Sequence, residues 1–138
     1  MENQYTLKVY PAGKGTTVYR VIEIAGKETL QKLCSVIIDA FDFIGEHLYE
    51  FCMDNRMYSD YSYQSDPEHG QQSVRVNLDK LGLVKGQKFS HYDFGDDWMF
   101  TINVQKITEV QKASKPSVVK EKGHIEQYPD WDDEDYDE

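Results

Sequence analysis

The densest group of chemically active side chains is the segment Tyr92-Asp93-Phe94-Gly95-Asp96-Asp97-Trp98. Three carboxylates lie here within five residues, next to two aromatic rings. Carboxylates at a tight bend can bind a hard cation or accept hydrogen bonds from a basic group of a partner. Aspartate is also an ordinary turn residue, and Gly95-Asp96 fits a two-residue hairpin loop with a positive φ at the glycine. The spacing leaves both interpretations open.

Two histidines extend this group. His91 and Asp93 are two residues apart, so a strand places both on one face. A His/Asp pair can act as a base with its orienting group, or it can bind a metal. His47 lies on the apolar face of its own predicted strand, where a lone histidine is more often a hydrogen-bonded core residue. The candidate metal set is His47, His91, Asp93 and Asp96, and no serine or cysteine nucleophile motif accompanies it.

The elements that position these residues follow from hydrophobic periodicity. Alternating apolar residues predict strands at 5–10, 17–24, 47–53, 88–93 and 98–105. One apolar stripe at helical spacing predicts a four-turn helix, with Thr29 as N-cap and Gly45 as C-cap. Its members are Leu30, Leu33, Cys34, Ile37, Ile38, Phe41 and Ile44. A short second helix is predicted at 78–81.

This order of elements predicts an α+β fold. We expect a mainly antiparallel sheet of about five strands, with one long amphipathic helix packed on one face and a short second helix. Residues 1–110 form the predicted domain, 111–125 a lysine-bearing linker, and 126–138 an acidic C-terminal tail. The loss of periodicity and the change in charge along the chain place these boundaries.

Charge is distributed unevenly along the 138 residues, whose formal net charge is −10. Residues 126–138 carry eight carboxylates and no lysine or arginine, which leaves 15 basic and 17 acidic residues in the rest. This balance argues against direct DNA binding, and no apolar run approaches the length of about 20 residues that a membrane-spanning helix needs. The tail itself offers a further hypothesis, since clustered carboxylates with Tyr128, Trp131 and Tyr136 can mimic nucleic acid.

The cysteines and the N-terminus indicate a reducing compartment. Cys34 and Cys52 have neither zinc-ribbon nor CxxC spacing, and both lie among apolar neighbours. The first residues contain no basic segment followed by an apolar stretch, so a secretory signal is not expected. We therefore predict a cytoplasmic protein with no cofactor.

Several motifs together resemble the plasmid pRiA4b ORF-3-like family, over most of residues 3–108. They are Tyr19-Arg20, Thr29-Leu30 with Leu33, His47-Leu48 with Phe51, Tyr58, and Tyr92-Asp93-Phe94-Gly95-Asp96 with Trp98. The resemblance implies an α+β domain and a link to mobile elements, because members are described as passengers of insertion elements. The chain departs from longer members at Tyr19, where a tryptophan is usual, and in lacking a Cys/Gly/Pro-rich end.

The resemblance does not imply an activity. A resolvase-like label is sometimes attached to this family, but a serine recombinase needs a nucleophilic serine among arginines and a basic DNA-binding region. The sequence shows neither.

The leading functional hypothesis is a non-catalytic binding module. Its surface would combine aromatic rings with carboxylates that select a basic protein surface, and it would act as a monomer or weak dimer. The residues expected at this surface are His47, Tyr58, Tyr92, Asp93, Asp96 and Trp98. The alternatives are a metal-dependent hydrolase or nuclease-like enzyme that uses the candidate metal set, and a nucleic-acid mimic formed by the tail.

Overall fold

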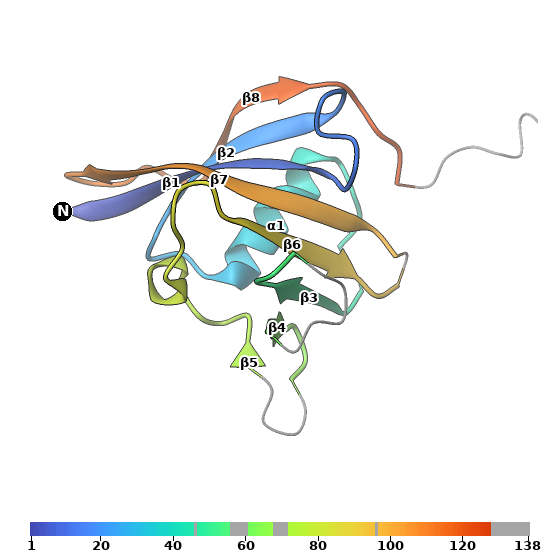
Figure 1. The fold of residues 1–138 in the computed structure, drawn as a ribbon, viewed down its shortest axis with the longest axis horizontal. Coiled ribbons are helices and arrows are strands. Elements are labelled where there is room, and N and C mark those ends of the chain that lie inside the picture. Colours follow the sequence, from blue (N-terminus) through green and yellow to red (C-terminus); the bar gives the residue numbers. More distant parts are fainter. Residues whose placement is uncertain (46, 56–60, 68–71, 96, 128–138) are drawn as a thin grey trace, which may run out of the picture.

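The computed structural model describes residues 1–45, 47–55, 61–67, 72–95 and 97–127 (Figure 1). These residues form one eight-stranded sheet in the order β5-β4-β3-β6-β7-β1-β2-β8. Only β4 and β5 pair in parallel, and every other neighbouring pair is antiparallel. The strands are β1 Glu2–Pro11, β2 Tyr19–Ala25, β3 Tyr49–Cys52, β4 Ser62–Gln64, β5 Gln72–Ser73, β6 Lys88–Asp93, β7 Met99–Val110 and β8 Ser117–Lys122.

The predicted fold class is wrong in its strand and helix content. The described residues form a mixed sheet of eight strands and one α-helix, and the predicted second helix is a single 3-10 turn, η1, at Leu78–Leu81. The additional strands are β4, β5 and β8. Two of them are too short to show a period of two, and β8 is exposed throughout, so no buried face marks it in the sequence.

The stretch predicted as a linker contributes to the sheet. Within 111–125, strand β8 pairs antiparallel with β2, and Ala113 is buried. Most of the acidic tail, residues 128–138, lies outside the described residues. Among the described residues, no helix has both the length and the apolar character needed to cross a membrane.

Helix α1, Leu30–Ala40, begins as predicted and ends early. The Thr29 side chain accepts a hydrogen bond from the Lys32 amide at 3.0 Å, which caps the first turn. The helix ends at Ala40 rather than near Gly45, because Phe41 and Phe43 turn inward against Phe100. The stripe that predicted four turns therefore includes residues that pack from a loop.

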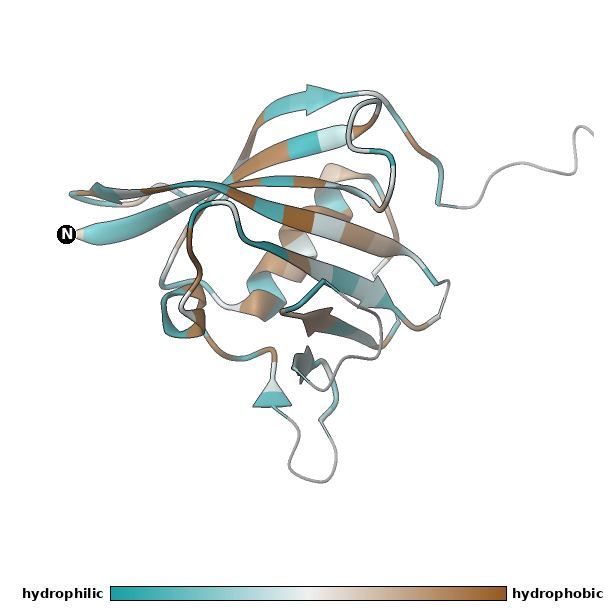
Figure 2. Ribbon diagram, in the orientation of Figure 1, coloured by the Kyte–Doolittle hydropathy of each residue, from teal (hydrophilic) through white to brown (hydrophobic). Residues whose placement is uncertain are grey.

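A single core lies between α1 and the sheet. Figure 1 shows α1 crossing one face of the sheet, and Figure 2 shows β8 as largely hydrophilic. The fully buried side chains of the core include Leu7, Ile22, Ile24, Leu30, Leu33, Ile37, Phe51, Phe89, Phe100 and Ile102. They come from the helix and from β1, β2, β3, β6 and β7, so these elements hold the candidate site rigidly.

Candidate binding site at the His47–Asp93 pair

The turn after β6 is organised by Asp93. The Asp93 Oδ1 atom accepts a hydrogen bond from the Gly95 amide at 2.7 Å. The Asp93 amide donates to the Trp98 carbonyl, and the Asp97 amide donates to the Asp93 carbonyl, both at 2.9 Å. Among the described residues of this turn, Asp97 has a positive φ of 58°, and Gly95 does not. The expected two-residue Gly95-Asp96 loop with a left-handed glycine is therefore wrong.

The second oxygen of Asp93 binds His47. The His47 Nδ1 atom lies 3.2 Å from Asp93 Oδ2, and the two side chains are 31% and 9% exposed. The chain next to His47 also contacts this turn, because the Phe94 amide donates to the Leu48 carbonyl at 3.0 Å. The two sequence motifs that contain His47 and Asp93 thus form one tertiary unit.

Cys34 and His91 form a buried pair behind this unit. The Cys34 Sγ atom lies 3.2 Å from His91 Nε2, and the Tyr49 ring stacks on the His91 ring at 5.1 Å. Burial lowers the pKa of His91 to about 4 and raises the pKa of the Cys34 thiol to about 12. Both groups are therefore neutral near pH 7, unlike the thiolate–imidazolium pair of a cysteine nucleophile.

A hollow opens between α1 and the start of β3, beside these two pairs. Its volume is about 340 Å³, and we call it the α1–β3 hollow, lined by Gln31, Cys34, Ser35, Ile38, Asp39, Gly45 and Tyr49. A pocket of about 10 Å³ shares four of these residues and adds His47, His91 and Asp93. The described residues that line the two spaces include two carboxylates and no lysine or arginine.

The structure brings together only part of the predicted surface. His47 and Asp93 are in contact and line the small pocket beside the α1–β3 hollow. Tyr92 alternates with Asp93 along β6, so its side chain is on the other face, where its hydroxyl donates to Asp97 Oδ1 at 2.6 Å. Trp98 packs against Phe43. Tyr58 and Asp96 lie outside the described residues.

The members of the candidate metal set have different surroundings. His91 contacts the Cys34 sulfur, whereas His47 contacts Asp93. Within the described part of the chain, no group of three or more His, Cys, Asp or Glu side chains is placed to hold one metal ion. The fourth proposed ligand, Asp96, lies outside that part.

Several residues that build the site could not be assigned to it from the sequence. Helical spacing places Cys34 on the buried stripe, but its contact with His91 depends on how α1 lies on the sheet. No sequence pattern predicted that Gln127 contacts this site. Its side chain accepts a hydrogen bond from the Ile44 amide at 2.6 Å and donates to the Ile44 carbonyl at 3.2 Å, while its carbonyl accepts from Trp98 Nε1. These bonds hold the end of the described chain against the loop that follows α1.

Comparisons with known proteins agree with the sequence resemblance. The crystal structure of a protein of unknown function, MM3350 from Methanosarcina mazei Go1, has a TM-score of 0.71 and 22% sequence identity to this chain. The similarity covers 88% of this chain and 70% of that one, and at this identity it shows a shared fold. No curated protein matches the chain. The sequence profile of the plasmid pRiA4b ORF-3-like protein family matches residues 3–132, and the chain belongs to that family.

Proposed function

We propose that this protein is a non-catalytic binding module whose α1–β3 hollow receives a cationic group from the surface of a protein partner. The observation that supports this function best is the charge of the hollow. Asp39 contributes a carboxylate to its lining, and Asp93 contributes one to the small pocket beside it. None of the described residues that line either space is lysine or arginine. A lysine or arginine side chain of the partner complements such a site.

The shape of the hollow suits a long cationic side chain. Ile38 and Tyr49 offer apolar surface for the methylene stem of a lysine or arginine. Asp39 is exposed on α1, where it can meet the charged head. Asp93 lines the small pocket beside the hollow, where the Gly95 amide and His47 hold its carboxylate in place.

The chemistry of the inner wall favours binding over catalysis. Cys34 and His91 are a potential nucleophile and base in contact on this wall, at 3.2 Å. Desolvation keeps the thiol protonated and the imidazole neutral, which opposes formation of a thiolate. We therefore infer that Cys34 and His91 have a structural role in the wall of the hollow and no catalytic role.

The cellular setting is part of the same proposal. Cys34 and Cys52 are both buried thiols that form no disulfide, which suits a reducing, cytoplasmic environment. The link to mobile elements that the family resemblance implies would place the partner among proteins of such elements.

A titration with a minimal cationic probe tests the proposal. We expect acetyl-Gly-Lys-Gly-amide, added to the ¹⁵N-labelled full chain, to shift the amides of Cys34, Gly45 and Tyr49 in a saturable way. The same peptide with Glu in place of Lys should leave these amides unchanged. The ion pair between Asp39 and the lysine of the peptide would be exposed to solvent, so Asp39→Asn should weaken binding about two- to fivefold.

Asp42→Asn is the matched control for this variant. Asp42 is exposed three residues further along, it does not line the hollow, and its φ of 57° suits asparagine. Its binding should equal that of the unmodified chain. Equal affinity of the lysine and glutamate peptides, or equal weakening by both substitutions, would overturn the proposed function.

A further inference from the structure

Strand β8 ends the sheet and leaves one edge unpaired. Among the residues that the structure describes, it pairs with β2 alone, and all six of its residues are exposed. The free N–H and C=O groups of an edge strand are a template for pairing with another extended segment. Val118 and Val119 are among the large apolar residues that the protein exposes. This edge can therefore accept a further strand.

The register of β8 gives its two faces different chemistry. Val118 is opposite the buried Ile22, so both side chains face α1. The register shifts at Val119, after which Lys120 is opposite Val21. Lys120 consequently lies on the face away from α1. The edge thus has the apolar Val118 on its inner face and the basic Lys120 on its outer face.

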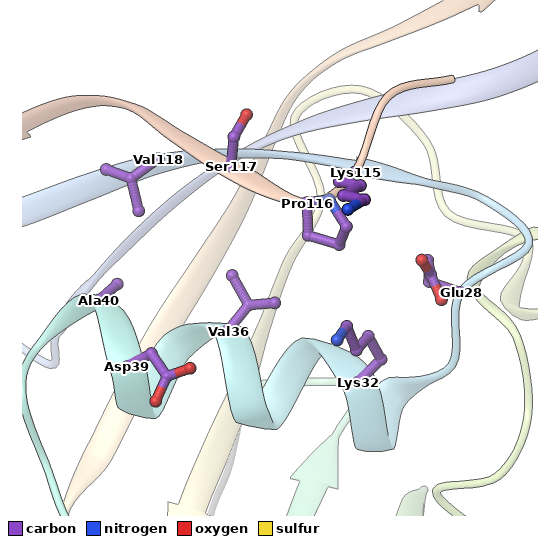
Figure 3. A pocket seen from close by; sticks show the side chains of 9 residues that line it. All are labelled: Glu28, Lys32, Val36, Asp39, Ala40, Lys115, Pro116, Ser117 and Val118. Atoms are coloured by element: carbon purple, nitrogen blue, oxygen red, sulfur yellow. The ribbon is translucent and has the colours of Figure 1, made fainter. Parts of the chain in front are cut away.

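A groove runs along the inner face, between β8 and α1. Its volume is about 590 Å³, and we call it the α1–β8 groove, lined by Glu28, Lys32, Val36, Asp39, Ala40, Lys115, Pro116, Ser117 and Val118. Figure 3 shows Val118 and Pro116 on the β8 side, directed toward Val36 on the helix, while Ser117 points away. The groove is therefore apolar between Val36 and Val118, with Glu28, Lys32 and Lys115 gathered at one end. Asp39 lies on the helix between Val36 and Ala40.

The outer face carries a local excess of positive charge. Lys122 is opposite Tyr19 in the register and lies on the same face as Lys120. Lys8 of β1 reaches this region as well, with its Nζ atom 4.6 Å from the centre of the Tyr19 ring. Glu121 is on the inner face, where its carboxylate lies 3.8 Å from Arg20 Nε. The outer face of this edge is thus basic, although the net charge of the chain is −10.

We propose that β8 binds an extended peptide with alternating acidic and apolar residues, which adds to the sheet as a ninth strand. Its backbone pairs with the free edge of β8. Its apolar side chains enter the α1–β8 groove against Val36 and Val118, and its carboxylates lie over Lys120 and Lys122. Such strand addition takes affinity from main-chain hydrogen bonds and specificity from alternate side chains. This surface shares Asp39 with the α1–β3 hollow, but its basic outer face selects the opposite charge.

Titration of the ¹⁵N-labelled full chain with acetyl-Glu-Val-Glu-Val-Glu-Val-amide tests the proposal. We expect saturable shifts of the amides of residues 117–122 and of Val36. The peptide with Lys in place of Glu should bind at least about fivefold more weakly, since two or more charge pairs are reversed. A version N-methylated at alternate residues on the pairing edge should not bind.

Two substitutions separate the contributions of charge and groove. Lys120→Glu should weaken binding about two- to fivefold, and Val118→Thr by a similar factor. Lys106→Glu and Val84→Thr are the matched controls, because both residues are exposed and lie outside the groove and β8. The controls should bind as the unmodified chain does, and an unchanged melting temperature shows that each variant folds.

Four results would overturn the proposal. The first is equal binding of the N-methylated peptide, and the second is equal binding of the lysine peptide. A third is binding only after residues 128–138 are removed, which would make the chain's own acidic end the occupant. The last is concentration-dependent shifts of residues 117–122 without peptide, which would make a second copy of the chain the occupant.

Discussion

Gly95 lies directly against the ring of His47. A β-carbon at residue 95 would overlap the His47 ring atoms. The same glycine donates its amide to Asp93 Oδ1, while Asp93 Oδ2 is 3.2 Å from His47 Nδ1. The three residues therefore form a closed unit. The glycine is required for space, since its φ is not positive.

Gly95→Ala should therefore destabilise the protein. The added methyl group must displace the His47 ring, which separates it from Asp93, and we expect a loss of about 1–3 kcal/mol in the free energy of unfolding. Chemical denaturation measures this loss. In a His47→Ala background the overlap is absent, so the same substitution should cost less than half as much. Equal costs in the two backgrounds would show that His47 is not the obstacle.

Stability should fall as the pH drops from about 6.5 to about 4, in part because of His91. Burial lowers the pKa of His91 to about 4 in the folded protein, below its ordinary value of 6.5. Between these values the unfolded chain binds a proton that the folded protein does not, so acid favours unfolding by up to about 3 kcal/mol from this residue. The full contribution is present above pH 6.5.

NMR titration of the His91 imidazole measures this effect directly. Cys34 and Tyr49 face the ring, and Asp93 lies on the same face of β6. We expect the ring to stay neutral in the folded protein down to about pH 4, and to titrate near pH 6.5 in concentrated urea. A folded-state midpoint near 6.5 would contradict the assigned burial effect.

The Cys34 thiol should be unreactive in the folded protein. Its pKa is raised from 9.0 to about 12, so the thiolate fraction at pH 8 falls by about a thousandfold. We expect iodoacetamide to modify Cys34 at least that much more slowly in the folded chain than in 6 M guanidinium, measured by mass spectrometry of the peptide containing residue 34. Rapid modification under native conditions would indicate an activated thiol and would favour a catalytic role.

Arg20→Lys should be destabilising although it preserves the charge. Arg20 is buried, and its guanidinium donates from Nε to the Ala40 carbonyl at 3.0 Å and from one terminal nitrogen to the Lys122 and Gly123 carbonyls at 3.1 Å. A lysine cannot reproduce this planar set of donors, so we expect a loss of about 2–3 kcal/mol.

Arg75→Lys provides the control, because Arg75 is exposed and the same substitution there should change stability by less than about 0.5 kcal/mol. Thermal or chemical unfolding distinguishes the two. A similar small effect at both positions would mean that the carbonyl contacts of Arg20 contribute little.

Strands and the helix start were predictable where one face is buried and the pattern is local. The strand predicted at 88–93 matches β6 at both ends. The N-cap predicted at Thr29 is also confirmed, because a cap depends only on residues within the first turn of the helix. The helix end was not predictable, because Phe41 and Ile44 continue the helical spacing of the stripe although both lie beyond the last helical residue, Ala40. Phe41 is buried there, whereas Ile44 is exposed. The exposed strand β8 was predicted as a linker, since its pairing with β2 joins segments about a hundred residues apart.

For the candidate site, the sequence by itself determined the family motifs and the residue types, which include carboxylates and histidines. It indicated that His91 and Asp93 share a face of one strand, because side chains alternate along a strand. Only the tertiary structure decided that Asp93 binds His47, that His91 turns to Cys34, and that Tyr92 is on the opposite face from the hollow. The physical reason is that these contacts depend on strand register and on how α1 lies on the sheet, which are set by packing of the whole core rather than by neighbours in the chain.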